Sequence, residues 1–288
     1  MPANPTSYSK RALALRLVAF VAAAAAATVA VGPVAGLLFG PLGINPGQPA
    51  AIWLSSVLVS AALLGVTWAA LRMERDGLGA LGLVPTRQRA AEFGAGFAVA
   101  SVLFALVALV RAASVGADWT FDAASGARAA IVGLPVAFAL MFAEELLFRG
   151  YAFREAEALW GAPAALVGSS LLFGAYHVVG SGEYWGMGAF FLFAMPALGG
   201  LVFGLAALRT GGLALPIGLH LGGNWVSASV LGLGVPEGAA LWAAPVDAMQ
   251  AAWLMAPDLL PRLPYIVGVA LLAVAVMTWP RRDRQVAA

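Results

Sequence analysis

Residues 129–150 read AAIVGLPVAFALMFAEELLFRG, and this stretch decides the fold class of the chain. Its first two thirds carry no charged residue, and it then ends in Glu144, Glu145 and Arg149. An α-helix needs about 20 predominantly apolar residues to cross the roughly 30 Å of hydrocarbon in a bilayer. The stretch is therefore predicted to belong to a membrane-spanning helix that carries charged groups near its end.

The remainder of the chain has the same apolar character. Of the 288 residues, 62% are hydrophobic and only 10% are charged, whereas a soluble domain has about 25% charged residues because its surface faces water. Eight windows are long and apolar enough to span a membrane: 13–38, 51–71, 91–110, 129–157, 163–180, 187–208, 212–233 and 263–280. We therefore expect an all-α fold, a polytopic transmembrane bundle of about eight spanning helices.

Three regions are expected along the chain. They are membrane helices one to three with their loops over 1–120, a core of helices four to seven over 121–233, and a long loop followed by a C-terminal membrane helix over 234–288. Prolines interrupt 234–262, so this segment is predicted to be loop in which an interfacial helix could lie. The first apolar stretch extends beyond the core of a usual secretory signal and is expected to be a retained helix.

The basic residues predict the orientation, because cytoplasmic loops hold an excess of Lys and Arg. With the N-terminus inside, one side holds Lys10, Arg11, Arg16, Arg72, Arg75, Arg87, Arg89, Arg149, Arg154, Arg209, Arg281, Arg282 and Arg284, and the other holds Arg111, Arg128 and Arg262. Both termini are therefore expected to be cytoplasmic. The net charge of +2 is explained by these short loops, so the expected partner is the lipid bilayer and not nucleic acid. Arg far outnumbers Lys and Ala is abundant, which is typical of a GC-rich bacterial genome and favours the bacterial plasma membrane.

The chain contains no cysteine. This excludes disulfides, thiolate metal sites and a cysteine nucleophile. A metal ion, if one is bound, must use histidine, carboxylate or amide ligands.

Ionisable residues within the predicted spans form three clusters. A charge in hydrocarbon is unfavourable, so each such residue is a candidate for function with a partner. In a helix, Glu145 and Arg149 are four residues apart and close enough to pair, whereas Glu144 is turned about 100° onto another face. Alone, such a group is often only the polar rim of a spanning helix.

The other two clusters contain both histidines of the chain. Phe173 precedes His177 by one helical turn, and Asn224 follows His220 by one turn on the same face. A single histidine or asparagine in a membrane helix is often only a hydrogen bond between helices, and Phe173 alone is packing. The convergence of carboxylates, imidazoles, an amide and a guanidinium on three helices favours a reactive site. The clusters share one depth if the fourth helix continues past Gly150 through Glu157.

These residues resemble those of a known family, the CAAX prenyl endopeptidase-like membrane proteases, also called the CPBP or Abi family. That family is recognised by E-E-x-x-x-R, F-x-x-x-H and H-x-x-x-N on separate membrane helices in this order. The patterns stand here as Glu144-Glu145 with Arg149, Phe173 with His177, and His220 with Asn224. The similar region covers about 130–230, and the rest of the chain is similar only as generic membrane helices.

The resemblance implies an intramembrane endopeptidase whose catalytic core is the region 121–233. By analogy, Glu144 and His177 would hold and activate a water, His220 and Asn224 would form the oxyanion hole, and Glu145, Arg149 and Phe173 would support them. The substrate would be a peptide or membrane protein cut near a hydrophobic or lipid-modified C-terminal segment, with prenylation left open.

Metal dependence is also left open at this point. The family is commonly classed with metalloproteases, but the chain has no H-E-x-x-H pattern. Two histidines and the carboxylates could bind Zn²⁺ or another divalent metal through Glu144, His177 and His220, or could activate water directly. We favour direct activation without a tightly bound cofactor.

Two other functions are compatible with the same residues. Buried Glu, His and Arg also form proton relays and substrate sites in transporters and proton-coupled carriers, although no inverted repeat is found. A scaffold of the same fold without catalytic activity is the other alternative, and the complete set of patterns argues against it.

Overall fold

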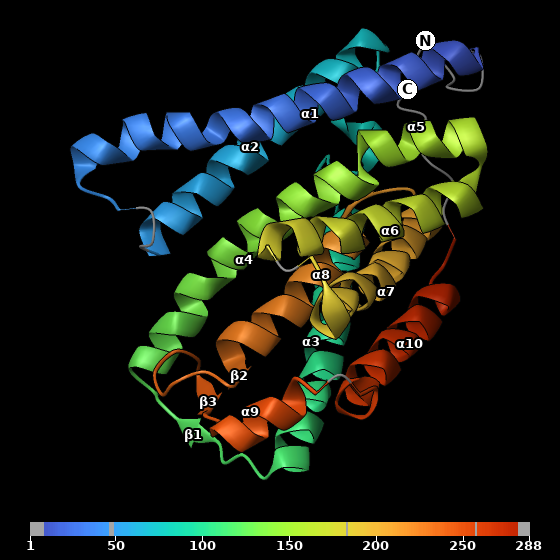
Figure 1. Cartoon of the computed structure of the whole chain (residues 1–288). Helices are drawn as coiled ribbons and strands as arrows, with labels where there is room; N and C mark the ends of the chain where they lie inside the picture. The colour runs from blue at the N-terminus through green and yellow to red at the C-terminus, as the bar shows by residue number, and fades with distance from the viewer. Residues whose placement is uncertain (1–8, 46–48, 183, 257, 282–288) are drawn as a thin grey trace.

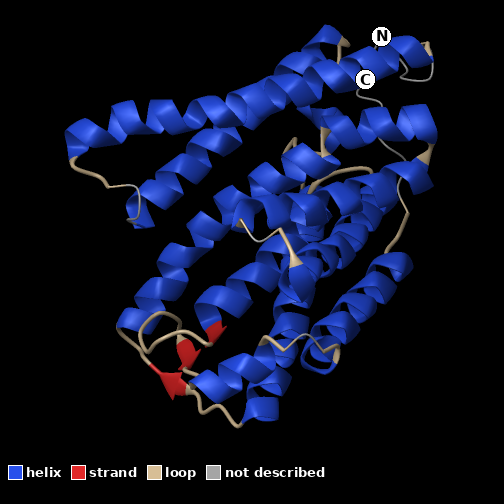
Figure 2. Cartoon of the chain, viewed as in Figure 1, coloured by secondary structure: helices blue, strands red, loops and turns tan. Residues whose placement is uncertain are grey.

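The computed structural model describes residues 9–45, 49–182, 184–256 and 258–281. Over these residues the chain is a helical bundle with three short strands at one end (Figures 1 and 2). Seven segments of the described ranges are long and apolar enough to cross a membrane: Lys10–Leu42, Ala50–Met73, Arg87–Val115, Ser125–Trp160, Ala162–Ser181, Gly186–Thr210 and Leu260–Thr278. The prediction of an all-α polytopic membrane bundle of about eight spans is confirmed.

The orientation in the bilayer remains a prediction. Two of the arginines on which it depends, Arg282 and Arg284, lie outside the described residues. The division into regions 1–120, 121–233 and 234–288 also remains a prediction.

A long hairpin of two helices covers one face of the bundle (Figure 1). Its members α1 (Lys10–Phe39) and α2 (Pro49–Met73) pack on each other and against α4 and α5. The other helices are α3 (Arg87–Val115), α4 (Ser125–Arg149), α5 (Tyr151–Trp160), α6 (Ala162–Ser181), α7 (Gly186–Thr210), α8 (Ala214–Trp225), α9 (Ala248–Leu254) and α10 (Leu263–Thr278). Single turns of 3-10 helix cover Gly40–Leu42, Leu78–Leu81 and Leu260–Arg262.

Helix α8 lies inside the bundle, between α3, α4 and α7. Every residue from 214 to 223 is buried. With 12 residues, α8 is about 18 Å long, which is too short to cross the bilayer alone. The window 212–233 is therefore apolar mainly because it is buried in protein. The predicted spanning helix over 212–233 differs from the structure in its second half. There a π-helical turn (Val226–Val230) leads into a strand.

The fourth predicted helix does not continue straight through Gly150. It breaks there into α4 and α5, and Gly150 adopts φ −80° and ψ −129°. A side chain at this position would clash, because a Cβ on Gly150 would lie 2.2 Å from the carbonyl oxygen of Leu146. Glycine therefore permits the break that turns the polar α5 toward α1 and α6.

A small sheet, not predicted from the sequence, closes the far end of α4 and α8 (Figure 2). Its strands are β1 (Thr120–Phe121), β2 (Leu231–Leu233) and β3 (Trp242–Ala244), in the order β1-β3-β2. Strand β3 runs antiparallel to β1 and parallel to β2. The remainder of 234–262 is largely loop with one short helix, α9, which agrees with the expected loop.

A buried ionic network fastens the hairpin to the bundle at the end opposite the sheet. Glu74, which is 2% exposed, accepts hydrogen bonds from Arg16 of α1 and from Tyr151 and Arg154 of α5. Arg154 also donates to Asp76 at 2.7 Å. Three segments far apart in the sequence are thus joined through one carboxylate.

We predict that Glu74→Gln lowers the free energy of unfolding by about 3 kcal/mol, because removing one partner leaves buried charge uncompensated. Unfolding of the detergent-solubilised protein measures this change. The control is Asp118→Asn in the exposed loop after α3, which is expected to leave stability unchanged. Equal stability of the two variants would contradict the proposed role of the network.

Candidate active site

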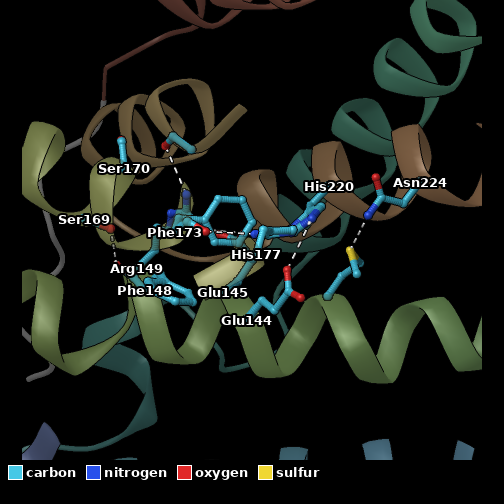
Figure 3. A network of polar contacts seen from close by, with 12 residues as sticks. Glu144, Glu145, Phe148, Arg149, Ser169, Ser170, Phe173, His177, His220 and Asn224 are labelled. Carbon is cyan, nitrogen blue, oxygen red and sulfur yellow. Dashed lines mark hydrogen bonds and ion pairs between the residues drawn. The ribbon is translucent and has the colours of Figure 1, made fainter. Parts of the chain in front are cut away.

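Three helices bring the predicted polar clusters together in the interior of the bundle (Figure 3). The clusters are Glu144, Glu145 and Arg149 on α4, Phe173 and His177 on α6, and His220 and Asn224 on α8. Figure 3 shows the carboxyl group of Glu144 pointing toward the two imidazoles. All the residues that sequence analysis singled out therefore lie in one neighbourhood, although they face different parts of it.

Glu145 connects two of the three clusters. Its Oε1 lies 3.2 Å from Nη1 of Arg149 and 2.8 Å from Nδ1 of His220. The side chains of Glu145 and Arg149 are both 0% exposed, so the predicted pairing four residues apart is present and fully buried. A carboxylate that accepts from Nδ1–H fixes the orientation of an imidazole and directs Nε2 elsewhere.

Arg149, which pairs with Glu145, also contacts α7 and α6. Its Nη2 donates to the carbonyl oxygen of Gly200 at 3.1 Å, and its guanidinium lies over the ring of Phe173, 4.3 Å from the centroid. Space for this contact exists because residue 200 is glycine: a Cβ there would lie 2.9 Å from Nη2 of Arg149. The arginine compensates the negative charge of Glu145 in a region closed to water.

Glu144 lies on another face of α4, as predicted, and behaves differently. Its Oε2 is 3.6 Å from Nε2 of His220, and its side chain is 15% exposed. This Oε2 is buried without a hydrogen-bond partner among the described residues. A buried carboxylate oxygen normally accepts a hydrogen bond. Oε2 of Glu145 also lacks a partner among the described residues, but Glu145 is 0% exposed whereas Glu144 lines a cavity. Glu144 is therefore the carboxylate with access for a water or a substrate group.

His177 is held by its own helix. Its Nδ1 lies 2.8 Å from the carbonyl oxygen of Phe173, one turn earlier. A carbonyl oxygen only accepts, so Nδ1 must carry the hydrogen, and Nε2 of the neutral ring has a free lone pair. The ring also contacts Phe173 edge to face, with centroids 4.6 Å apart.

Sequence analysis did not identify three residues that shape the site. Phe203 of α7 stacks on the imidazole of His220 with centroids 4.4 Å apart, Met141 accepts from Nδ2 of Asn224 at 2.9 Å, and Gly200 receives Arg149. Phe203 and Met141 have no pattern around them that distinguishes them from packing residues. Only the glycine pair 199–200 in a spanning helix was a signal for close packing.

The site lies between two cavities. A large cavity of about 750 Å³ separates the α1–α2 hairpin from α4 and has Glu144 and Tyr176 in its otherwise largely apolar wall. A small cavity of about 100 Å³ is lined by His177, His220 and Asn224, and Asn224 is itself exposed. Glu144 and the histidines thus line different cavities, yet Glu144 and His220 meet at their common boundary.

The described residues do not form a metal centre in this arrangement. No group of three or more His, Cys, Asp or Glu side chains among them is placed to hold an ion. Nδ1 of His220 faces Glu145 and Nδ1 of His177 faces the carbonyl oxygen of Phe173, so Nε2 is the atom of each ring that is directed at water or substrate. Without an assembled set of three ligands among the described residues, the side chains themselves are the candidates for activating water.

Glycines allow α8, the helix that carries His220, to pack closely against α3. A Cβ on Gly222 of α8 would lie 2.3 Å from the carbonyl oxygen of Phe97 on α3, and one on Gly218 would lie 2.2 Å from that of Phe93. The two backbones touch on the side of α8 that faces away from His220 and Asn224, because residues two positions apart on a helix point in nearly opposite directions. The position of both side chains therefore depends on α3, which contributes none of the predicted site residues.

We predict that Gly222→Ala lowers the free energy of unfolding by about 1–3 kcal/mol, because the added methyl group overpacks a closed interface. The control is Gly168→Ala in α6, where an added Cβ meets nothing within 4 Å and alanine favours the helix. Unfolding in detergent measures both variants. An unchanged stability of Gly222→Ala would show that α8 is not seated by this contact.

One comparison with known proteins identifies this region. Residues 126–226 match the family model described as type II CAAX prenyl endopeptidase Rce1-like. The matched segment begins in the first turn of α4, ends just after α8 and contains every residue in the three patterns. The resemblance inferred from the sequence is thereby confirmed over these residues. No curated protein and no solved structure gives a significant match.

Proposed function

We propose, from the Rce1-like match over residues 126–226, that this integral membrane protein is an endopeptidase that hydrolyses a peptide bond within the membrane. The family match suggests a CAAX protease-type activity. The observation that carries the proposal is the unpartnered buried oxygen of Glu144, 3.6 Å from Nε2 of His220. A free carboxylate beside an oriented imidazole is a suitable arrangement for activating water.

Glu144 and His177 hold the nucleophilic water. Both present acceptors, the Glu144 carboxylate and Nε2 of His177, to the two hydrogens of one water molecule. Its oxygen lone pair is then free to attack. As the oxygen bonds to the scissile carbonyl carbon, Glu144 takes the proton and acts as general base.

His220 and Asn224 stabilise the oxyanion that forms on the former carbonyl oxygen. Protonated His220 donates from Nε2 while Glu145 accepts from Nδ1 and compensates the charge of the imidazolium. The amide of Asn224 supplies a second donor, which it directs to Met141 in this structure. When the tetrahedral intermediate collapses, the C–N bond breaks and Glu144 returns its proton to the leaving nitrogen.

The substrate is a membrane-associated peptide. The cavity of about 750 Å³ beside Glu144 supports this assignment, because its wall is largely apolar and matches a hydrophobic or lipid-modified segment next to the scissile bond. Prenylated peptides are one class that fits this description. Comparison of a quenched peptide with and without a C-terminal prenyl group distinguishes a requirement for the lipid from a requirement for hydrophobic sequence.

We predict that Glu144→Gln, His177→Ala and His220→Ala each reduce cleavage of a quenched peptide library by at least about 100-fold, because each removes a group that contacts the reacting atoms. Cleavage is measured with purified protein in liposomes, with thermal unfolding as a check of folding. The matched control is Glu237→Gln in the exposed loop after β2, which should cleave at the rate of the unmodified protein. Cleavage that survives all three site substitutions would refute the assignment.

A second test concerns metal dependence. If side chains alone activate the water, cleavage should be unchanged after dialysis against EDTA and 1,10-phenanthroline. The protein recovered from dialysis is assayed with and without added Zn²⁺. Loss of cleavage that Zn²⁺ restores, with loss of Zn²⁺ binding in His177→Ala, would overturn direct activation and leave the assignment of the site intact.

A further inference from the structure

An apolar groove lies on the outside of the bundle, away from the cavities of the candidate active site. It measures about 500 Å³ and runs between α3, α9 and α10. Leu106 of α3 and Val267 of α10, 53% and 54% exposed, are among the side chains that line it. Ser114 is the single hydroxyl in a lining that is otherwise apolar over the described residues. The volume and the apolar lining of the groove suit a hydrocarbon chain.

Two arginines stand at one end of this groove. Arg111 follows the lining residue Val107 by one helical turn and precedes Ser114 by three residues, so it lies on the groove side of α3. Arg262 immediately precedes α10, between the lining residues Leu260 and Leu263. In Figure 1 the lower ends of α3 and α10 lie near α9 in the lower part of the bundle.

Both arginines keep capacity for an anion. Nε of Arg111 is buried without a hydrogen-bond partner among the described residues. Arg262 donates to the carbonyl oxygens of Ala256, Asp258 and Met255 and lies over the ring of Phe191. These acceptors are neutral, so the hydrogen bonds orient Arg262 without compensating its charge.

The backbone adds to the positive potential. Helix α10 begins at Leu263 with no side-chain cap, and the N-terminus of a helix carries a partial positive charge. Both arginines lie at helix ends, where lipid headgroups are expected. Guanidinium groups bind phosphate oxygens in a bidentate manner. A ligand that suits both the arginines and the groove therefore carries a negative charge and an apolar chain.

We propose that this groove binds one anionic phospholipid, with its phosphate between Arg111 and Arg262 and an acyl chain along α3 and α10. The site shares no lining residue with either cavity of the candidate active site. Helix α10 stands between them: Val267 and Leu271 line the groove, whereas Val269 and Leu272 line the small cavity beside the histidines. Bound lipid thus supports the outer side of one wall of that cavity.

Native mass spectrometry of the purified full chain tests the headgroup contact. Delipidated protein is titrated with phosphatidylglycerol or phosphatidylcholine. One phosphatidylglycerol should bind at least tenfold more tightly than phosphatidylcholine, and Arg111→Gln should remove this preference. The control is Arg128→Gln, an exposed arginine in the first turn of α4, which should retain it. Equal binding of both lipids, or an unchanged preference in Arg111→Gln, would overturn the proposal.

Two further arms test the acyl contact and the source of the phosphate. Val267→Trp fills the groove and should weaken phosphatidylglycerol binding at least tenfold, whereas Val274→Trp, exposed on α10 outside the groove, should not. Inorganic phosphate at millimolar concentration should not displace the lipid. Displacement by phosphate would indicate a site for a simple anion. Undiminished phosphatidylglycerol binding by Val267→Trp would show that the acyl chain does not lie in the groove. Either result would refute the proposal.

Discussion

One buried carboxylate organises the centre of this protein. Glu145 faces Arg149 on its own helix and His220 on α8, at 3.2 Å and 2.8 Å, in a region where neither acidic nor basic side chain reaches solvent. A charge in such surroundings is tolerated only if it is paired and hydrogen-bonded. Because Arg149 also donates to Gly200 of α7, α4, α7 and α8 are constrained together, and the orientation of His220 follows from this constraint.

Close backbone contacts make that constraint possible. Gly218 and Gly222 let α8 touch α3, and Gly200 leaves room for Arg149. In lipid, helices gain little from burying apolar surface against each other, so small residues that allow dense packing have a large influence on association. The polar residues therefore select the geometry of the site, and the glycines of α7 and α8 leave the space that this geometry needs.

The sequence predicted those features that depend on local helix geometry and on the high cost of charge in a membrane. The Glu145–Arg149 pair and the convergence of His177 and His220 follow from spacing and scarcity. The short length of α8 did not follow, because burial in protein and burial in lipid select the same apolar residues. The break at Gly150 and the stacking of Phe203 on His220 depend on tertiary contacts that leave no periodic signal. The small sheet was not predicted either, because β1 pairs with β3, which lies about 120 residues later in the chain.

Hydrolysis inside a bilayer requires water and an apolar substrate to meet at one point. The two cavities offer a separate place for each of them. The large cavity is mainly apolar, and the small one is lined by two imidazoles and an amide. Glu144 lies in the wall of the first and within 3.6 Å of His220 in the wall of the second. In the proposed mechanism, the general base at this boundary reaches water from one side and the scissile bond from the other. Its adjacent residue, Glu145, faces inward and stays committed to Arg149 and His220. Two neighbouring carboxylates on one helix thereby serve different purposes, because a turn of about 100° places one in a cavity and the other in the packed interior.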